Sequence, residues 1–70
     1  MPRRLSSREI EAVLTQHGFA FSRQKGSHRV FTRPGCPSHV TVVAGEREVP
    51  VGTFAKIIRQ SGLTRQDFGV

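Results

Sequence analysis

Acidic residues are scarce in this chain, and its middle has none between Ala12 and Gly45. The chain as a whole has eleven lysines and arginines against five acidic residues, a formal net charge of +6. The cations of the acid-free stretch are Arg23, Lys25, Arg29 and Arg33. Because a region of one sign attracts polyanions in a salt-dependent way, the charge favours a nucleic-acid partner over a merely solvated basic surface.

Cysteine occurs once, so the chain cannot form an internal disulfide, and a reducing, cytoplasmic setting is expected. Cys36 lies in the proline- and glycine-rich stretch of residues 33–37, which we interpret as a turn rather than as the site of a catalytic thiol. No apolar run has the length of a membrane span, and the chain opens on Met-Pro-Arg-Arg instead of a hydrophobic signal segment. A membrane partner and secretion are therefore not expected.

The length of 70 residues predicts one domain with a thin core and no deep enclosed pocket. Chemistry on such a domain has to take place on an open surface or in a shallow groove. A polymer suits that kind of site better than a small metabolite does.

A glycine turn carries a serine and a histidine between two cations, in the run Lys25-Gly26-Ser27-His28-Arg29. Histidine exchanges protons near neutral pH, and the flanking cations can hold a phosphate. The cluster suits chemistry on a phosphodiester, although by itself it is equally compatible with an ordinary basic hairpin.

Capping signals predict a helix on each side of this turn. Ser6 and Glu9 form a capping box, and we expect the first helix over residues 7–17, with Gly18 ending it. A second helix is expected to start at Pro50, to carry an apolar stripe, and to end at Gly62. A weak capping box at residues 64–67 predicts a last turn that docks Phe68.

Alternating residues predict three strands between the helices, over residues 19–23, 28–33 and 38–43, joined by short turns. The expected architecture is therefore α+β, in the order α-β-β-β-α, with both helices on one face of a three-stranded antiparallel sheet. Phe31 should face the helices. His28 lies three positions away, so it should point to the opposite face and be exposed.

The sequence resembles the HicA family, the RNA-cleaving toxins of bacterial toxin–antitoxin pairs. The resemblance covers most of the chain, from the early His17-Gly18-Phe19 to the Gly-Ser-His turn with Phe31 after it. It continues through Val40-Thr41-Val42 and Gly52-Thr53-Phe54 to the closing Ile57-Ile58-Arg59-Gln60-Ser61-Gly62-Leu63.

The resemblance implies a fold similar to the double-stranded-RNA-binding domain and the toxin role of a type II toxin–antitoxin system. It also implies ribosome-independent cleavage of mRNA, a HicB-type antitoxin that covers the active surface, and His28 as the catalytic residue. Many members have a proline and a second histidine just after the third strand, where this sequence has Val43-Ala44-Gly45. This protein therefore does without a second imidazole or works more weakly.

Few acidic residues are available for a metal, and they lie outside the central strands. The histidines also lack the spacing of metal ligands. We therefore expect cleavage without metal or other cofactor. The RNA's own 2′-hydroxyl would attack, His28 would act as general base or acid, cations would hold the phosphate, and a 2′,3′-cyclic phosphate would remain.

The expected RNA contacts lie around the turn and on the last helix: Arg23, Lys25, Gly26, Ser27, Arg29 and Lys56. Lys25 is the strongest candidate for a phosphate contact, because it adjoins the turn. Arg29 shares the parity of Phe31, so it is expected nearer the sheet edge than to His28. Ser27 either orients His28, donates to a phosphate, or serves as an ordinary turn serine. Gly26 serves the turn and also lets the RNA backbone approach closely.

The other two histidines are interpreted differently. His17 falls at the end of the first helix, where an imidazole complements the helix dipole. His39, on the third strand, is the only substitute for the missing histidine, but an ordinary surface role is favoured.

Two other functions compete with the nuclease. A non-catalytic RNA-binding module would have the same fold and charge, and the missing histidine keeps it open. A DNA-binding adaptor would explain the charge but not the Gly-Ser-His turn.

Overall fold

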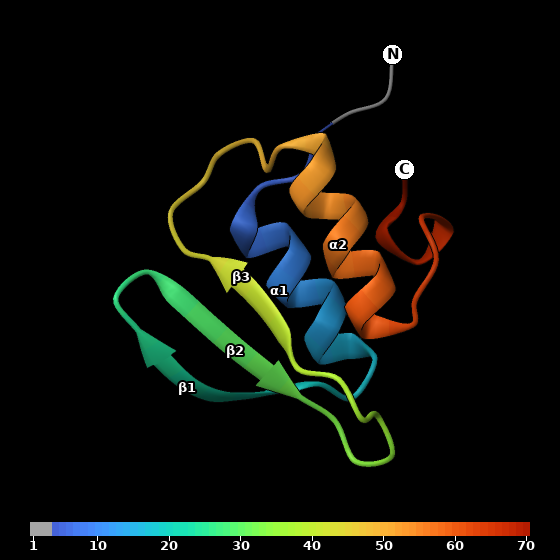
Figure 1. The fold of residues 1–70 in the computed structure, drawn as a ribbon. Helices are drawn as coiled ribbons and strands as arrows, with labels where there is room; N and C mark the ends of the chain where they lie inside the picture. The colour runs from blue at the N-terminus through green and yellow to red at the C-terminus, as the bar shows by residue number, and fades with distance from the viewer. Residues whose placement is uncertain (1–3) are drawn as a thin grey trace.

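The structure, a computed structural model, describes residues 4–70, so the first three residues of the basic start lie outside the described part. The elements are α1 (Ser7–Gln16), β1 (Ala20–Lys25), β2 (His28–Thr32), β3 (Val40–Val43), α2 (Val51–Ser61) and a 3₁₀ turn, η1 (Gln66–Phe68). This is the predicted α-β-β-β-α order. Figure 1 shows the two helices side by side on one side of a three-stranded antiparallel sheet, whose strand order is β1-β2-β3.

The predicted capping box starts α1. The Ser6 hydroxyl accepts from the backbone N–H of Glu9 at 3.2 Å, and the Glu9 carboxylate accepts from the N–H of Ser6 at 2.9 Å. The helix ends one residue earlier than predicted, because His17 has left the helical conformation and forms the C-cap. Gly18 follows with a φ of 90°, a conformation that favours glycine.

The second helix and the last turn also match the prediction. Gly62 ends α2 in the left-handed conformation. Phe68 is buried and meets Phe54 edge to face, with ring centroids 5.2 Å apart. Thr64 and Asp67 exchange hydrogen bonds that close this turn.

One apolar core lies between the helices and the sheet. Its members come from every element except β1: Leu5, Ile10, Leu14, Phe19, Phe31, Val40, Val42, Val49, Phe54, Ile57 and Phe68. All six residues of β1 are exposed, because this strand lies at the edge of the sheet farthest from the helices. Among residues 4–70, no helix is both long and apolar enough to cross a membrane.

The strands differ from the prediction at their ends. The first runs over Ala20–Lys25, and Phe19 is buried just before it. The third begins at Val40, so His39 lies outside the strand. The cause is the turn after β2, whose two prolines cannot donate ladder hydrogen bonds and which extends to Ser38.

A hydroxyl buried beneath the sheet ties α1 to the end of β3. Ser7 is 1% exposed, its Oγ donates to the carbonyl of Val43 at 2.5 Å, and the same oxygen accepts from the N–H of Glu46 at 3.1 Å. The backbone of Ser7 also donates to the carbonyl of Glu46. The loop after β3 is therefore fixed to the start of the first helix.

Candidate active site

His28 is the first residue of β2, and its side chain is exposed. Phe31, three positions later, is 3% exposed and lies in the core. The predicted alternation is confirmed, since the two side chains point to opposite faces of the strand. Across the sheet, His28 pairs with Lys25 on β1 and with Val43 on β3.

A β-bulge places the cations of β1 on the same face as His28. Phe21 pairs with Phe31, but the register shifts between Phe21 and Arg23, so Arg23 pairs with Val30. Without the bulge, strand alternation would put Arg23 on the face of Phe21. With it, the face turned away from the helices, called the open face below, carries Arg23, Lys25, His28, Val30, Thr41 and Val43.

A groove of about 340 Å³ runs beside His28, between the open face and α2. Its lining comes from three elements: His28 of β2, Thr41 and Val43 of β3, and Thr53, Lys56, Ile57 and Gln60 of α2. The α2 residues border the open face because this helix lies along the outer edge of β3, where the N–H of Thr41 donates to Oε1 of Gln60 at 3.4 Å. None of the described residues that line the groove is acidic, so the electrostatic character of the groove is set by Lys56.

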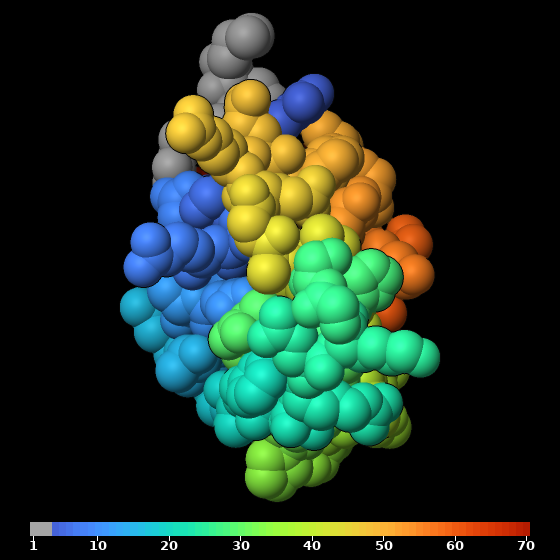
Figure 2. All heavy atoms as spheres, turned by 90° about the vertical axis from the view of Figure 1, so that its left-hand side faces the viewer, coloured from blue at the N-terminus to red at the C-terminus, as the bar shows by residue number. Residues whose placement is uncertain are grey.

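The turn before His28 is held from both sides. Gln24 donates from its side chain to the carbonyl of Gly26 at 2.8 Å, and the N–H of Ala44 donates to the carbonyl of Ser27 at 2.7 Å. Gly26 has a φ of 60°, and a Cβ there would meet nothing within 4 Å. The positive φ, and not a lack of space for a side chain, therefore explains why a glycine occupies position 26. Figure 2 shows the hairpin of β1 and β2 projecting into solvent, with α1 on one side and α2 on the other.

Arg29 lies on the other face of the sheet, toward α1. Its Nε is 3.0 Å from the carboxylate of Glu11, and its Nη1 is 3.2 Å from the side-chain oxygen of Gln24. The guanidinium also stacks on Phe21, 4.6 Å from the ring centroid. Of the six expected RNA contacts, Arg29 is the one that the structure places on the helix side of the sheet, and Lys56 joins His28 in the groove.

Comparison with known protein families identifies the family of this chain. A family model described as the HicA toxin of bacterial toxin–antitoxin matches residues 7–63, which include His28 and all of the groove. The chain belongs to the HicA toxin family. Membership makes it the toxin component of a toxin–antitoxin pair, so its partner is an antitoxin. A search of curated proteins found no match.

In this HicA-family chain, the other two histidines lie away from the groove. His39 precedes β3 at the end opposite to Val43, so it lies four residues, or roughly 13 Å, along the strand direction from the position that pairs with His28. It does not replace the missing histidine next to His28. Within residues 4–70, no three His, Cys, Asp or Glu side chains gather so as to hold a metal ion.

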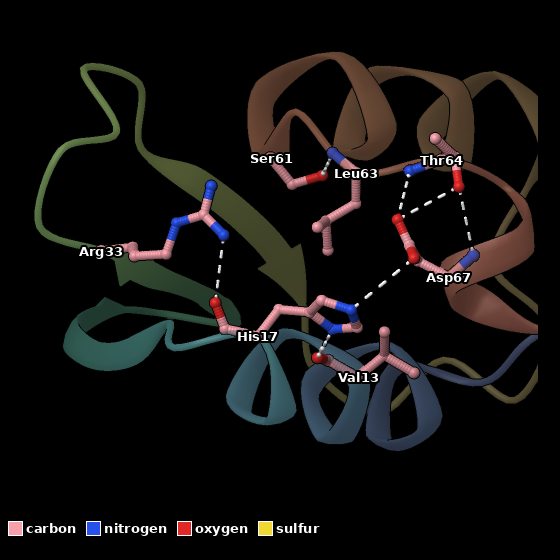
Figure 3. A network of polar contacts seen from close by, with 7 residues as sticks. All are labelled: Val13, His17, Arg33, Ser61, Leu63, Thr64 and Asp67. Carbon is pink, nitrogen blue, oxygen red and sulfur yellow. Dashed lines mark hydrogen bonds and ion pairs between the residues drawn. The ribbon is translucent and has the colours of Figure 1, made fainter.

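His17 belongs to a polar network that joins the end of α1 to the C-terminal turn (Figure 3). Its Nδ1 is 2.9 Å from the carbonyl of Val13, and its Nε2 is 3.7 Å from the carboxylate of Asp67. Arg33 donates to the carbonyl of His17 at 3.0 Å and so caps the helix end. Hydrogen bonds from the backbone and the hydroxyl of Thr64, aided by nearby His17, hold the pKa of Asp67 below its usual value.

The sequence analysis missed three polar groove residues of this HicA-family chain, Thr41, Thr53 and Gln60. A signal was present, because Thr53, Lys56 and Gln60 follow at helical spacing and so share one side of α2. Helical spacing does not say which element that side meets. Only the packing of α2 against the edge of β3 brings it to the open face.

Proposed function

We propose that this HicA-family toxin is an mRNA endonuclease that acts in the cytoplasm without metal, and that a HicB-type antitoxin holds it inactive. In this proposal, residues 1–70 form one domain that both binds and cleaves RNA. The observation that carries it is the position of His28. This imidazole is exposed at the rim of a groove, opposite Lys25 on the sheet and in one hollow with Lys56 on α2.

The reaction needs few protein groups. The 2′-oxygen of the RNA forms a bond to phosphorus, the bond from phosphorus to the 5′-oxygen breaks, and a 2′,3′-cyclic phosphate and a 5′-hydroxyl result. His28 either takes the proton from the 2′-hydroxyl or gives one to the leaving 5′-oxygen, and water serves at the other position. A single positioned acid–base group contributes typically 10²–10⁴-fold, so a slow nuclease is expected.

The cations bind the phosphates on both sides of the imidazole. Lys25 and Arg23 contact the RNA from β1, and Lys56 contacts it from α2. Positive charge aimed at the reacting phosphate also stabilises the negative charge that develops there. Gly26 adopts the positive φ that the turn before His28 requires. Among residues 4–70, no hydrogen bond involves the Ser27 hydroxyl, which in this proposal donates to a phosphate oxygen.

The antitoxin is proposed to cover the open face and the groove. A surface of net positive charge with no acid in the groove attracts an acidic partner, which then competes directly with RNA for the same cations. Inhibition thus needs no change in the shape of the toxin.

One observation favours a second candidate, a non-catalytic RNA-binding module. In the part of the chain that the structure describes, His28 is the only imidazole that lines the groove, whereas acid and base roles are often divided between two groups. Such a module would bind RNA through the same surface and leave it intact.

Expression in cells without antitoxin separates the two. We expect the wild type to arrest growth and to remove full-length mRNA, and His28→Ala to do neither. His39→Ala serves as the matched control, since it removes an exposed histidine outside the groove and should remain toxic. Intact mRNA with the wild type, or equal toxicity of wild type and His28→Ala, would contradict the nuclease.

A further inference from the structure

A hydrogen bond to the backbone of β3 orients the side-chain amide of Gln60 at the edge of the groove. Its Oε1 lies 3.4 Å from the backbone N–H of Thr41, on the free edge of β3. A backbone N–H can only donate, so the oxygen and not the nitrogen of the amide faces the strand. The amide nitrogen is thereby turned away from β3.

This nitrogen has no protein partner. Among residues 4–70, no hydrogen bond links Nε2 of Gln60 to any acceptor, and no buried side-chain nitrogen lacks a partner, so the group is open to solvent. Gln60 lines the same groove as His28. Two N–H donors of known orientation are therefore available to whatever occupies the groove.

The offset between His28 and Gln60 along the strand direction suits one nucleotide. Thr41, which orients Gln60, lies two residues along β3 from Val43, the cross-strand partner of His28, and two residues span about 7 Å. A phosphate at His28 therefore leaves the attached base near Gln60. Between these points the lining includes apolar Ile57 and Val43, which suit the flat face of a base.

We propose that Gln60 reads the base of the nucleotide bound at His28 and selects a carbonyl oxygen, O4 of uracil or O6 of guanine. Cytosine and adenine present an amino group at the same position. Two donors would then face each other, and a base of that kind binds more weakly. The inference rests on the proposed function only in requiring that RNA occupies the groove, and it does not require that the RNA is cut.

The test compares uracil with cytosine, two weakly stacking pyrimidines that differ where Gln60 is proposed to read them. Binding of short 2′-fluoro oligo(U) and oligo(C) is measured by fluorescence anisotropy at one salt concentration. The 2′-fluorine removes the attacking hydroxyl, so catalysis cannot affect the result. We expect the wild type to bind oligo(U) about fivefold more tightly than oligo(C).

Three variants distinguish base recognition by Gln60 from an effect of net charge and from the structural role of its bond to Thr41. Gln60→Glu keeps an acceptor for the N–H of Thr41 but offers no donors, so the preference should reverse toward oligo(C). Gln60→Met has a similar length and no polar group, so it should bind both alike. Gln66→Glu makes the same change of charge at an exposed position outside the groove and should leave the wild-type ratio intact.

Each outcome decides between the claims. Equal binding of the two oligonucleotides by the wild type, or the same ratio in the wild type and Gln60→Glu, overturns base reading and leaves Gln60 as a brace between α2 and β3. A ratio that reverses in a protein that cuts no RNA contradicts the nuclease but supports base reading. RNA cleavage by a wild type that binds the two oligonucleotides equally supports the nuclease and contradicts base reading. Absence of binding to either oligonucleotide contradicts both the nuclease and base reading.

Discussion

Lys25 and His28 are direct partners across the β1–β2 ladder, on the face of the sheet that the helices leave open. The bulge after Phe21 makes this pairing possible, because it turns the second half of β1 over relative to the first half. An edge strand thereby supplies both a core-side aromatic ring and cations for the opposite surface.

Removing one cation of the proposed RNA-binding surface should change the salt dependence of RNA binding. The slope of log K against log salt is negative, and Lys25→Met and Lys56→Met are each expected to reduce its magnitude by about 0.7, the value for one phosphate contact on a single-stranded nucleic acid. Anisotropy titrations at several salt concentrations measure this slope. Slopes equal to that of the wild type would show that neither lysine touches a phosphate.

Arg29 should act on stability and not on RNA. Because it pairs with Glu11 at 3.0 Å on the helix side of the sheet, a double-mutant cycle with Glu11→Gln and Arg29→Met should give a coupling of about 0.2–1 kcal/mol. Urea unfolding measures the coupling. RNA affinity should fall less with Arg29→Met than with Lys25→Met, and a larger fall would return Arg29 to the RNA-binding surface.

The buried hydroxyl of Ser7 should contribute to the stability of the fold, although the group is small. Ser7→Ala removes the side-chain acceptor of the N–H of Glu46 and leaves that donor without this partner, at a cost of about 1–3 kcal/mol in the free energy of unfolding. Ser22→Ala, at an exposed position in β1, is the control and should unfold at nearly the wild-type urea concentration. Equal midpoints for the two variants would contradict this role.

Asp67 should stabilise the protein only when it is charged. Its pKa is lowered in the folded state, so its contribution is complete above the unfolded aspartate pKa of about 3.9 and disappears as the pH falls through the lower folded value. Asp67→Asn should therefore lower the melting temperature at pH 7, and the gap to the wild type should close in strong acid. A gap that stays constant from neutral pH to pH 2 would show that charge is not the cause.

Much of the fold was predictable because its signals are local. The reciprocal bonds of Ser6 and Glu9 and the left-handed Gly62 depend on residues within one turn, so capping rules locate the helices. The exposure of His28 followed from its spacing to Phe31 once the second strand was recognised.

The rest of the site depends on packing between distant segments, which residue periodicity does not contain. Simple alternation would place Arg23 on the side of Phe21, and only the ladder with β2 reveals the bulge between them. Likewise, Lys56 and Gln60 meet His28 because α2 lies along the edge of β3, a relation set by the whole core. The ion pair that holds Arg29 also joins two residues, Glu11 and Arg29, that are 18 positions apart in sequence.

The chemistry at His28 is tested most directly by the ends of the RNA fragments that the purified protein produces in the presence of a metal chelator. We predict 2′,3′-cyclic phosphates and 5′-hydroxyls, formed about 10²–10⁴-fold more slowly by His28→Ala and at the wild-type rate by His39→Ala. Fragments ending in a 3′-hydroxyl and a 5′-phosphate, or an undiminished rate with His28→Ala, would contradict it.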